Sequence, residues 1–385
     1  MGGVSMEWKE VTLGEIAIFK TGKLNSNAAI SNGEYPFFTC SPETLRINSY
    51  AFDQEAILLA GNNAEGNFSI KYYKGKFNAY QRTYVITPIR GKVDIKFLYY
   101  ALSLCLKQLK NMSQGTSTKF LTVTILNSFS VKLPSISDQR RIASILSSLD
   151  RKIELNNKIN ADLEEMAQTI FKNWFVDFEP FKDGKFVDSE LGMIPEGWKV
   201  GTLGDITKNK SAKVKERNDV KVLSPVTTGE LVLSEEYFTK QVFSSSIAKY
   251  KIVNKGDFAY NPARVNIGSL GRNEFDFDGC VSPVYVVFSV LDGYENYFDL
   301  FRKTDFFKDS VASLAIGGVR QSLSYDDLSS IEVIIPSENA VEEFNNLYNQ
   351  MKKTIKANKL ENSRLSTLRD TLLPRLMSGE LEVPE

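Results

Sequence analysis

The chain contains an internal repeat, and this repeat limits the possible folds more than any other feature of the sequence. Residues 8–16 return without a gap as residues 198–206, with tryptophan, lysine, leucine, glycine, an acidic residue and isoleucine in the same order. The two segments are 190 positions apart in a chain of 385 residues, which is more than twice the common domain size. The sequence therefore predicts a domain of about 190 to 200 residues that is present twice.

A second match shows where the two copies differ in length. Residues 115–134 correspond to residues 317–336, which lie 202 positions later, and Leu121 falls on Leu323. The offset is 12 residues larger than in the first match. We therefore expect the second copy to be longer by about a dozen residues in its middle.

Both copies combine short strands with helices. Strand-like stretches occur at residues 56–59 and 284–288, and helical stretches follow at residues 95–109 and 296–312. Each copy is therefore predicted to contain a mixed α/β globular domain, and the chain to hold two such domains in a pseudo-two-fold repeat.

A long helix is predicted after each globular domain, because apolar residues recur there every seven positions. A heptad stripe with one asparagine at its centre is typical of a coiled coil. Since the two halves repeat, we expect the helices to form an antiparallel coiled coil in which Asn156 and Asn358 lie close together and set the register. Helices packed only on their own domains are the alternative. The stripes consist of Ile142, Leu149, Asn156, Leu163 and Ile170 in the first helix and of Phe344, Met351, Asn358, Leu365 and Leu372 in the second.

These features divide the chain into five segments. The one between the first helix and the second domain carries six acidic residues against two lysines, and its prolines, glycines and aromatic residues predict a linker that is held in place. The predicted segments are a globular domain at 1–134, a long helix at 135–176, the acidic linker at 177–197, a globular domain at 198–336 and a long helix at 337–379.

The composition excludes several kinds of chemistry. The chain has no histidine, so it can form neither a serine–histidine nor a cysteine–histidine nucleophile, and no imidazole-ligated metal site. Three cysteines without a signal peptide are typical of a reducing cytoplasmic protein, and the apolar runs are too short to cross a bilayer. No phosphate-binding glycine motif is present. The sequence predicts no catalytic or metal site and favours a binding function.

Local charge favours nucleic acid as the ligand. The 47 basic and 47 acidic residues cancel, but residues 1–133 hold 15 basic against 9 acidic side chains. Residues 71–82 interleave cations, which suit phosphates, with tyrosines and amides, which suit sugars and base edges. A strand pair whose lysines only face water is the alternative. In the second domain, with 17 basic and 18 acidic residues, the prediction depends on clustering. The predicted DNA contacts are Lys71, Tyr73, Lys74, Lys76, Gln81, Arg82, Lys208, Lys210, Lys213, Arg264 and Asn266.

Several motifs in combination resemble the specificity subunits of type I restriction–modification systems. They lie at residues 174–180 and 192–198 between the copies, at 139–142 where the first helix opens, and at 368–381 near the end. The resemblance covers the whole chain. It implies two target recognition domains, each reading one half of a split, asymmetric DNA site, and two antiparallel helices that set the gap and dock two modification subunits.

The resemblance also implies that catalysis belongs to partner subunits. Methyl transfer, ATP hydrolysis and DNA cleavage would occur there, with S-adenosylmethionine, ATP and Mg as their cofactors and none on this chain. The expected partners are double-stranded DNA, two methyltransferase subunits and restriction subunits, in the cytoplasm and away from membranes. It further places the polar loops 115–119 and 317–321 near DNA. The contacts expected from these loops are Thr116, Ser117, Lys119, Arg320 and Gln321.

Two other functions stay open on the sequence alone. One is the recognition part of a fused restriction–methylation enzyme, which the absence of methyltransferase and nuclease motifs disfavours. The other is a duplicated scaffold that binds protein without DNA specificity. Salt-dependent binding of DNA would distinguish the DNA reader from the scaffold.

Overall fold

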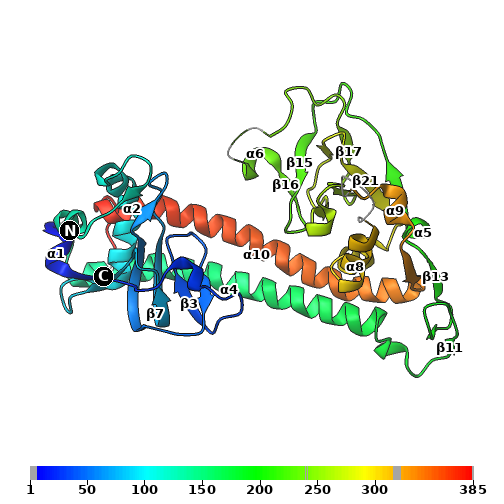
Figure 1. Cartoon of the computed structure of the whole chain (residues 1–385), viewed down its shortest axis with the longest axis horizontal. Helices are drawn as coiled ribbons and strands as arrows, with labels where there is room; N and C mark the ends of the chain where they lie inside the picture. The colour runs from blue at the N-terminus through cyan, green and yellow to red at the C-terminus, as the bar shows by residue number, and fades with distance from the viewer. Residues whose placement is uncertain (1–6, 239, 241, 315–321, 384–385) are drawn as a thin grey trace, which may run out of the picture. The chain divides into compact units, whose positions relative to one another are not determined.

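A computed structural model describes residues 7–238, 240, 242–314 and 322–383 of the chain (Figure 1). The contacts divide it into two compact units. Unit 1 consists of Met1–Asn157 together with Asn358–Glu385, and unit 2 consists of Lys158–Ala357. Each unit thus contains one globular domain and parts of both long helices, so the division passes through the helices and not between the predicted segments.

Unit 1 is built around a six-stranded sheet. A separate strand, β1 (Lys9–Thr12), pairs antiparallel with β10 (Ser130–Leu133). Helices α1 (Leu13–Ile16), α2 (Ile95–Met112) and α3 (Val123–Ser128) accompany the sheet, with a short 3-10 turn η1 (Ser26–Ala28). The order of the sheet is β2 (Ala17–Thr21), β8 (Thr83–Pro88), β5 (Phe52–Ala60), β7 (Ile70–Ala79), β3 (Tyr35–Phe38) and β4 (Leu45–Ile47).

The strand β5 explains how this sheet is buried. Its apolar run is typical of a strand covered on both faces, and alternate side chains enter two different cores. Ile57 and Leu59 pack in the cluster that includes Phe97 of α2, whereas Leu58 packs with Phe77 on the other face. The sequence positions α2 over the first face because the Asp94 carboxylate caps the helix by accepting from the backbone N–H groups of its first turn.

The end of the chain completes the core of unit 1. Leu376 and Val383 are buried in the same cluster as Phe97. Gly379 has a φ of +77°, and a Cβ atom there would lie 2.6 Å from Trp8 Nε1. Residues from both ends of the described chain therefore build one core.

Unit 2 repeats the central part of unit 1 and adds a second sheet. Its first strand pair joins β13 (Lys199–Thr202) and β22 (Glu332–Ile335). The first four-stranded sheet has the order β14 (Thr207–Lys210), β21 (Val286–Val290), β18 (Phe258–Tyr260) and β19 (Leu270–Arg272). The second has the order β16 (Leu231–Leu233), β15 (Lys221–Pro225), β20 (Gly279–Val281) and β17 (Lys251–Val253). The helical segments are α5 (Leu203–Ile206), α6 (Ser234–Tyr237), η3 (Val265–Ile267), α7 (Glu295–Phe301), α8 (Asp305–Leu314) and α9 (Tyr325–Ser329).

Equivalent hydrogen bonds confirm the predicted repeat. In unit 1 the backbone N–H of Leu13 donates to Phe129 O, and in unit 2 that of Leu203 donates to Ile331 O. The order β2-β8-β5-β7 in unit 1 also returns as β14-β21-β18-β19 in unit 2. The two domains therefore share one topology.

The extra length of the second copy lies where the offsets predict it. Ile89 N donates to Ile16 O in unit 1, and Leu291 N donates to Ile206 O in unit 2, so the additional residues fall between these partners. In unit 2 this region forms the β16-β15-β20-β17 sheet, whereas in unit 1 the strands β3 and β4 extend the central sheet.

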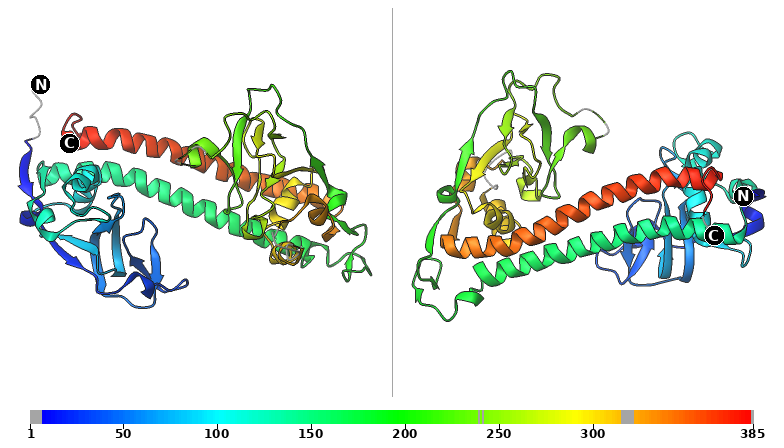
Figure 2. Two further views of the ribbon diagram at one scale, coloured as in Figure 1. Left: turned by 45° about the horizontal axis from the view of Figure 1, so that its top comes forward. Right: turned by 180° about the vertical axis from the view of Figure 1, so that it is seen from behind.

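The two long helices are α4 (Ile136–Phe175) and α10 (Glu338–Ser378), and they pair antiparallel as predicted. In unit 1, Asp150 near the start of α4 forms an ion pair of 2.7 Å with Arg369 near the end of α10. In unit 2, Phe175 at the end of α4 packs edge-on against Phe344 near the start of α10. Within each unit the two helices lie side by side in both views of Figure 2.

The register of the pair differs from the predicted Asn156–Asn358 contact. Asn156 is fully buried in the seam, but its Nδ2 donates to Glu361 Oε2 at 2.7 Å and to Asn362 Oδ1 at 2.9 Å. These partners lie about one helical turn beyond Asn358, which is half-buried. The prediction assumed that the two sequence midpoints face each other, whereas side-chain packing sets the offset between the helices.

The helix predicted over residues 296–312 is two helices, α7 and α8. The chain turns at Thr304, whose N–H and hydroxyl both donate to Phe301 O while the hydroxyl accepts from Phe307 N. Thr304 thus ends one helix and caps the next. The apolar period continues across the break, so the sequence pattern did not reveal it.

The acidic linker is ordered and packs on unit 2. It contains a 3-10 turn η2 (Glu179–Phe181) and the antiparallel pair β11 (Phe186–Val187) and β12 (Ile194–Pro195). The rings of Phe178 and Phe181 pack against Trp198 with centroids 5.5 and 5.0 Å away. None of the helices in the described part of the chain combines the length and apolar character needed to cross a membrane.

Candidate nucleic-acid interface

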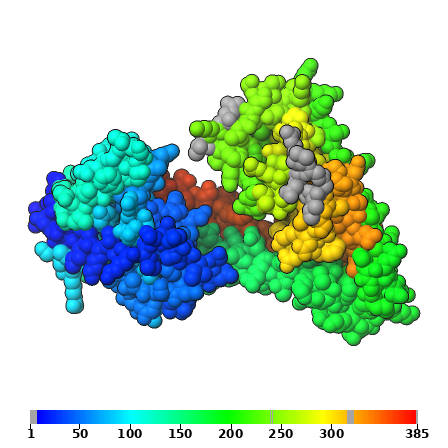
Figure 3. Space-filling view, in the orientation of Figure 1, coloured from blue at the N-terminus to red at the C-terminus, as the bar shows by residue number. Residues whose placement is uncertain are grey.

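Two polar loops lie together at one edge of unit 1. One joins β5 to β7, and the other joins α2 to α3 in the region drawn cyan-green at the surface in Figure 3. They are joined by the pairing of β6 (Asn62–Asn63) with β9 (Lys119–Phe120) and by a hydrogen bond of 2.8 Å from Leu121 N to Gly61 O. The second loop is closed on itself, because Gln114 and Phe120 exchange both backbone hydrogen bonds. The backbone of this edge is therefore fixed before any ligand binds.

The side chains of these loops offer polar groups to solvent. Thr116 and Ser117 are exposed, and among the described residues their hydroxyls have no hydrogen-bond partner. Lys119 is half-buried along β9. The Asn63 side chain holds the neighbouring loop by accepting from the N–H groups of Glu65 and Asn67.

Unit 2 repeats the backbone hydrogen bond that joins these segments in unit 1. Leu323 N donates to Pro262 O at 3.1 Å, which repeats the bond between Leu121 and Gly61 in unit 1. The loops that follow β5 and β18 both contain a left-handed glycine, Gly66 with a φ of +74° and Gly268 with a φ of +93°. The predicted contacts Arg320 and Gln321, with most of their loop, lie outside the described residues.

Only some of the lysines on the basic strand β7 are exposed to solvent. Lys74 and Lys76 are exposed, on the face opposite to Lys71 and Tyr73. Lys71 Nζ instead donates to the carbonyl oxygens of Ser41 and Glu43 at 3.1 and 2.8 Å, and burial lowers the pKa of its ammonium group. Lys71 therefore holds a loop of the fold and is not available as the predicted phosphate contact.

Tyr73 is also committed to the fold. Its ring packs against Phe38 and Phe77 with centroids 5.3 and 5.8 Å away. Tyr73 is half-buried and its ring stabilises the sheet, while its contact with DNA stays a prediction.

The turn after β7 carries a fixed pair of amides. Gln81 Nε2 donates to Asn25 Oδ1 at 2.7 Å, and Gln81 N donates to Leu24 O at 2.9 Å. Both amide side chains are exposed, as is the neighbouring Arg82. The sequence pattern did not identify Asn25, because it lies 56 residues from its partner.

The basic run in unit 2 is partly neutralised. Lys208 and Lys213 are exposed, but Lys210 Nζ forms an ion pair of 2.8 Å with Asp257. Asp257 is only 4% exposed, and a buried carboxylate requires such a cation. Lys210 therefore stabilises the buried carboxylate of Asp257, and its contact with DNA stays a prediction.

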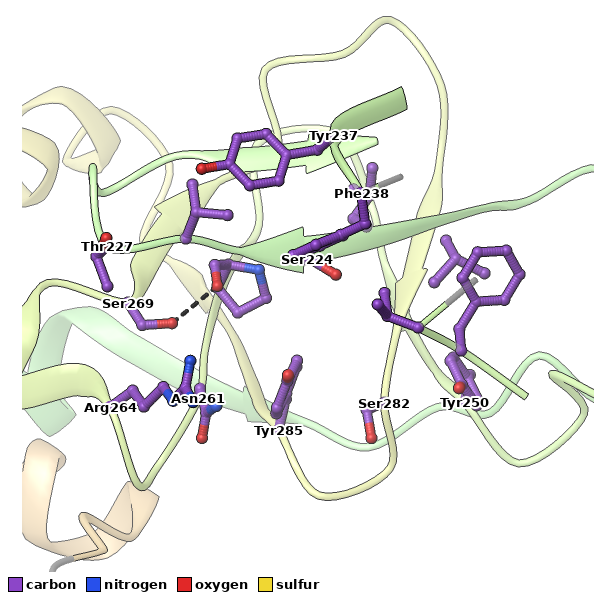
Figure 4. A pocket seen from close by; sticks show the side chains of 16 residues that line it. Ser224, Thr227, Tyr237, Phe238, Tyr250, Asn261, Arg264, Ser269, Ser282 and Tyr285 are labelled. Atoms are coloured by element: carbon purple, nitrogen blue, oxygen red, sulfur yellow. Dashed lines mark hydrogen bonds between the residues drawn. The ribbon is translucent and has the colours of Figure 1, made fainter. Parts of the chain in front are cut away.

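A pocket of about 340 Å³ lies beside the loop that follows β18 (Figure 4). Asn261 and Arg264 line it at one end, and Tyr237 and Tyr285 stand on opposite sides of it. Asn266, on the same loop, is exposed and does not line the pocket. The two tyrosines were missed from the sequence because they belong to separate elements.

The described residues contain no group of three or more cysteine, aspartate or glutamate side chains that could hold a metal ion. Residues 6–165 of the chain match the type I restriction modification DNA specificity domain family. The EcoDI type I restriction enzyme specificity subunit of Escherichia coli is 31% identical over 379 residues, which cover 87% of this chain and 79% of that protein. The chain belongs to the family of type I restriction enzyme specificity subunits.

Two further comparisons concern the sequence and the fold. The MjaIX specificity subunit of Methanocaldococcus jannaschii is 29% identical over 78% of this chain and 72% of its own. A crystal structure of a type I restriction–modification S subunit from M. genitalium aligns over 100% of this chain and 98% of that chain, with a TM-score of 0.64. Its sequence identity is 17%, so this likeness concerns the fold.

Proposed function

We propose that this chain is the DNA sequence-specificity subunit of a type I restriction–modification system. Each globular domain reads one half of a bipartite, gapped DNA site, and the antiparallel helices set the spacing and dock methyltransferase subunits. Beyond family membership, the supporting observation is that the loop after β5 and its backbone hydrogen bond to the segment before α3 return after β18. Equivalent loops carry different side chains, for example Asn63 after β5 and Arg264 after β18, so the two halves of the site would differ in sequence.

The candidate DNA contacts are the predicted residues that the fold leaves available. Exposed lysines would contact phosphates, and amide, hydroxyl and arginine side chains would contact base edges. The proposal keeps Lys74, Lys76, Gln81, Arg82, Thr116, Ser117 and Lys119 in the first domain and Lys208, Lys213, Arg264, Asn266, Arg320 and Gln321 in the second.

We further propose that this chain has no catalysis of its own. Methyl transfer with S-adenosylmethionine would occur on two methyltransferase subunits, and ATP hydrolysis and Mg-dependent cleavage on restriction subunits. The exposed apolar residues along the long helices, such as Leu155, Met166 and Leu360, are suited to contacts with such partners.

The test is to co-express this chain with the methyltransferase encoded beside it and to map modified bases in the host DNA at single-base resolution. A split motif with modified adenines in both halves is the expected result. A motif with one defined half would mean that one domain does not read DNA. A stable complex without methylation would favour the protein-binding scaffold instead.

A further inference from the structure

We propose that the pocket beside β18 is a guanine-recognition site, in which Asn261 and Arg264 bind the acceptor edge of that base. This inference rests on the proposed function, because it assigns one base class to the half-site read by the second domain. The pocket combines a fixed amide, a guanidinium group without a partner among the described residues, and two aromatic walls in one place (Figure 4).

The Asn261 amide offers its nitrogen to a ligand. Its Oδ1 accepts a hydrogen bond of 3.1 Å from the backbone N–H of Ala263. A backbone N–H can only donate, so the amide atom at this position must be the oxygen. The backbone of Asn261 is itself held, because its N–H donates to Ser269 O. One lone pair of Oδ1 is therefore already used, and the donors of Nδ2 are left for a ligand.

Arg264 adds further donors beside this amide. Its side chain is exposed, and among the described residues it has no hydrogen-bond or ion-pair partner. Its backbone is fixed by the bond from its N–H to Asn261 O and by its carbonyl, which accepts from Ser269 N. A guanidinium group has donors and no acceptor.

The other residues that line the pocket add no negative charge to these hydrogen-bond donors. The lining residues include no aspartate or glutamate, so Arg264 supplies the one charge of the pocket wall. The hydroxyl of Ser224 is paired with Ser234, and that of Ser269 donates to Pro225 O. The fixed and charged groups of the pocket thus offer donors.

Guanine is the base whose major-groove edge matches this arrangement. It presents two acceptors, N7 and O6, whereas adenine and cytosine each present an amino donor there, and thymine presents one acceptor and a methyl group. An arginine that donates to both guanine acceptors is the commonest specific contact between proteins and DNA. The bidentate contact of an asparagine with adenine needs Oδ1 as well as Nδ2, and here Oδ1 already accepts from Ala263 N, which favours the contact with guanine acceptors.

The sharpest test is Asn261→Asp in the complex with the methyltransferase. Aspartate keeps an oxygen for the Ala263 N–H and replaces the donor Nδ2 by an acceptor, with almost no change in size. Arg264→Ala is the second variant, and because Arg264 is exposed its loss should leave the fold intact. Binding is measured on duplexes that carry the methylated motif with all four base pairs at each position.

Both variants should lose the preference for a G·C pair at one and the same position, by about 5- to 150-fold. That position must lie in the half of the motif that Gln81→Ala leaves unchanged. Asn266→Asp is the matched control, since it makes the same charge change on the same loop outside the pocket. It should leave the preference for G·C at that position unchanged.

Three results would overturn the assignment. If Asn261→Asp and Arg264→Ala weaken all sequences equally, the pocket binds phosphate. If the position that loses its preference is not G·C, the base class is wrong. If the wild-type complex shows no sequence preference at all, the proposed function fails, and the guanine site fails with it.

Discussion

Replacing Arg302 by methionine should destabilise unit 2 strongly at neutral pH. Arg302 follows α7 and lies against the buried carboxylate of Asp299, with Nε and Nη2 2.9 and 2.6 Å from Oδ1. The two side chains are only 9% and 7% exposed. Arg302 Nη1 also donates to Leu270 O at 2.8 Å, at the end of the loop that carries the proposed guanine site. The Arg302 side chain therefore stabilises both the core of unit 2 and the loop that follows β18.

The size of the effect follows from the charge that remains. Removing one partner of a buried ion pair costs about 3–5 kcal/mol, because the other charge stays buried without compensation. A domain of this size loses about 2–4 °C of unfolding temperature per kcal/mol. Arg302→Met should therefore lower the unfolding temperature by roughly 6–20 °C at pH 7.

The effect should depend on pH. Burial alone would raise the pKa of Asp299, but Arg302, Lys303 and Lys352 outweigh it and hold the pKa well below its usual range. A carboxyl with a lowered folded-state pKa stabilises the protein above its unfolded pKa of about 3.9, and this contribution is lost as the pH falls. Without Arg302, burial should dominate and raise the pKa. The deficit of the variant should then be smaller at pH 5 than at pH 7, because Asp299 takes up a proton.

Thermal unfolding at both pH values measures these differences. Lys308→Met is the matched control, since it breaks the exposed ion pair with Asp305 and should cost less than about 1 kcal/mol. The double variant Asp299→Leu/Arg302→Met should be more stable than Arg302→Met alone. Equal losses in Arg302→Met and Lys308→Met, or a double variant no better than the single one, would refute the reasoning.

Three further sets of substitutions test other parts of the structure. The double variant Lys74→Ala/Lys76→Ala should weaken DNA binding and lower the slope of log affinity against log salt by up to about 2. Lys71→Ala should leave this slope unchanged and lower the unfolding temperature. The reverse pattern would contradict the observed faces of β7. Asn156→Leu should stabilise the helix pair by about 1–2 kcal/mol in thermal unfolding, since a buried asparagine costs stability. A loss of stability in this variant would mean that the two hydrogen bonds of Asn156 outweigh the burial of an apolar side chain. Gly268→Ala should lower the free energy of unfolding by about 1–3 kcal/mol, because a Cβ atom there would lie 2.7 Å from Thr227 O. Gly293 has a similar φ but open space around it, so Gly293→Ala should lower this free energy less. Equal losses in the two variants would exclude the contact with Thr227 as the cause.

The repeat and the long helices could be predicted because their signals are local in the sequence. Residues 8–16 match residues 198–206 one by one, and the heptad stripes need no knowledge of a partner. The predicted helix at 135–176 lies within one residue of α4 at each end. The register of the pair was not predictable in this way, because it depends on packing between segments some 200 residues apart.

The candidate site was predicted less well, because contacts with residues distant in the sequence decide which of its side chains are exposed. Lys71 and Lys74 look alike in the sequence, yet strand alternation places Lys71 on the face where its Nζ lies over the Phe38 ring and donates to Ser41 O. Lys210 is neutralised by Asp257, which lies 47 residues away. The amide of Asn261 is oriented by a local turn, so a close reading of such turns can recover part of the chemistry.

The composition of unit 1 has a consequence for how the protein is made. Its core includes Leu376 and Val383, so the ribosome must finish nearly the whole chain before this unit can close. Unit 2, at 158–357, is complete earlier. At 5–20 residues per second, its 200 residues keep the first 157 waiting on the order of 10–40 s. The half that is synthesised first therefore completes its core last, and during that interval its apolar surface is exposed to aggregation.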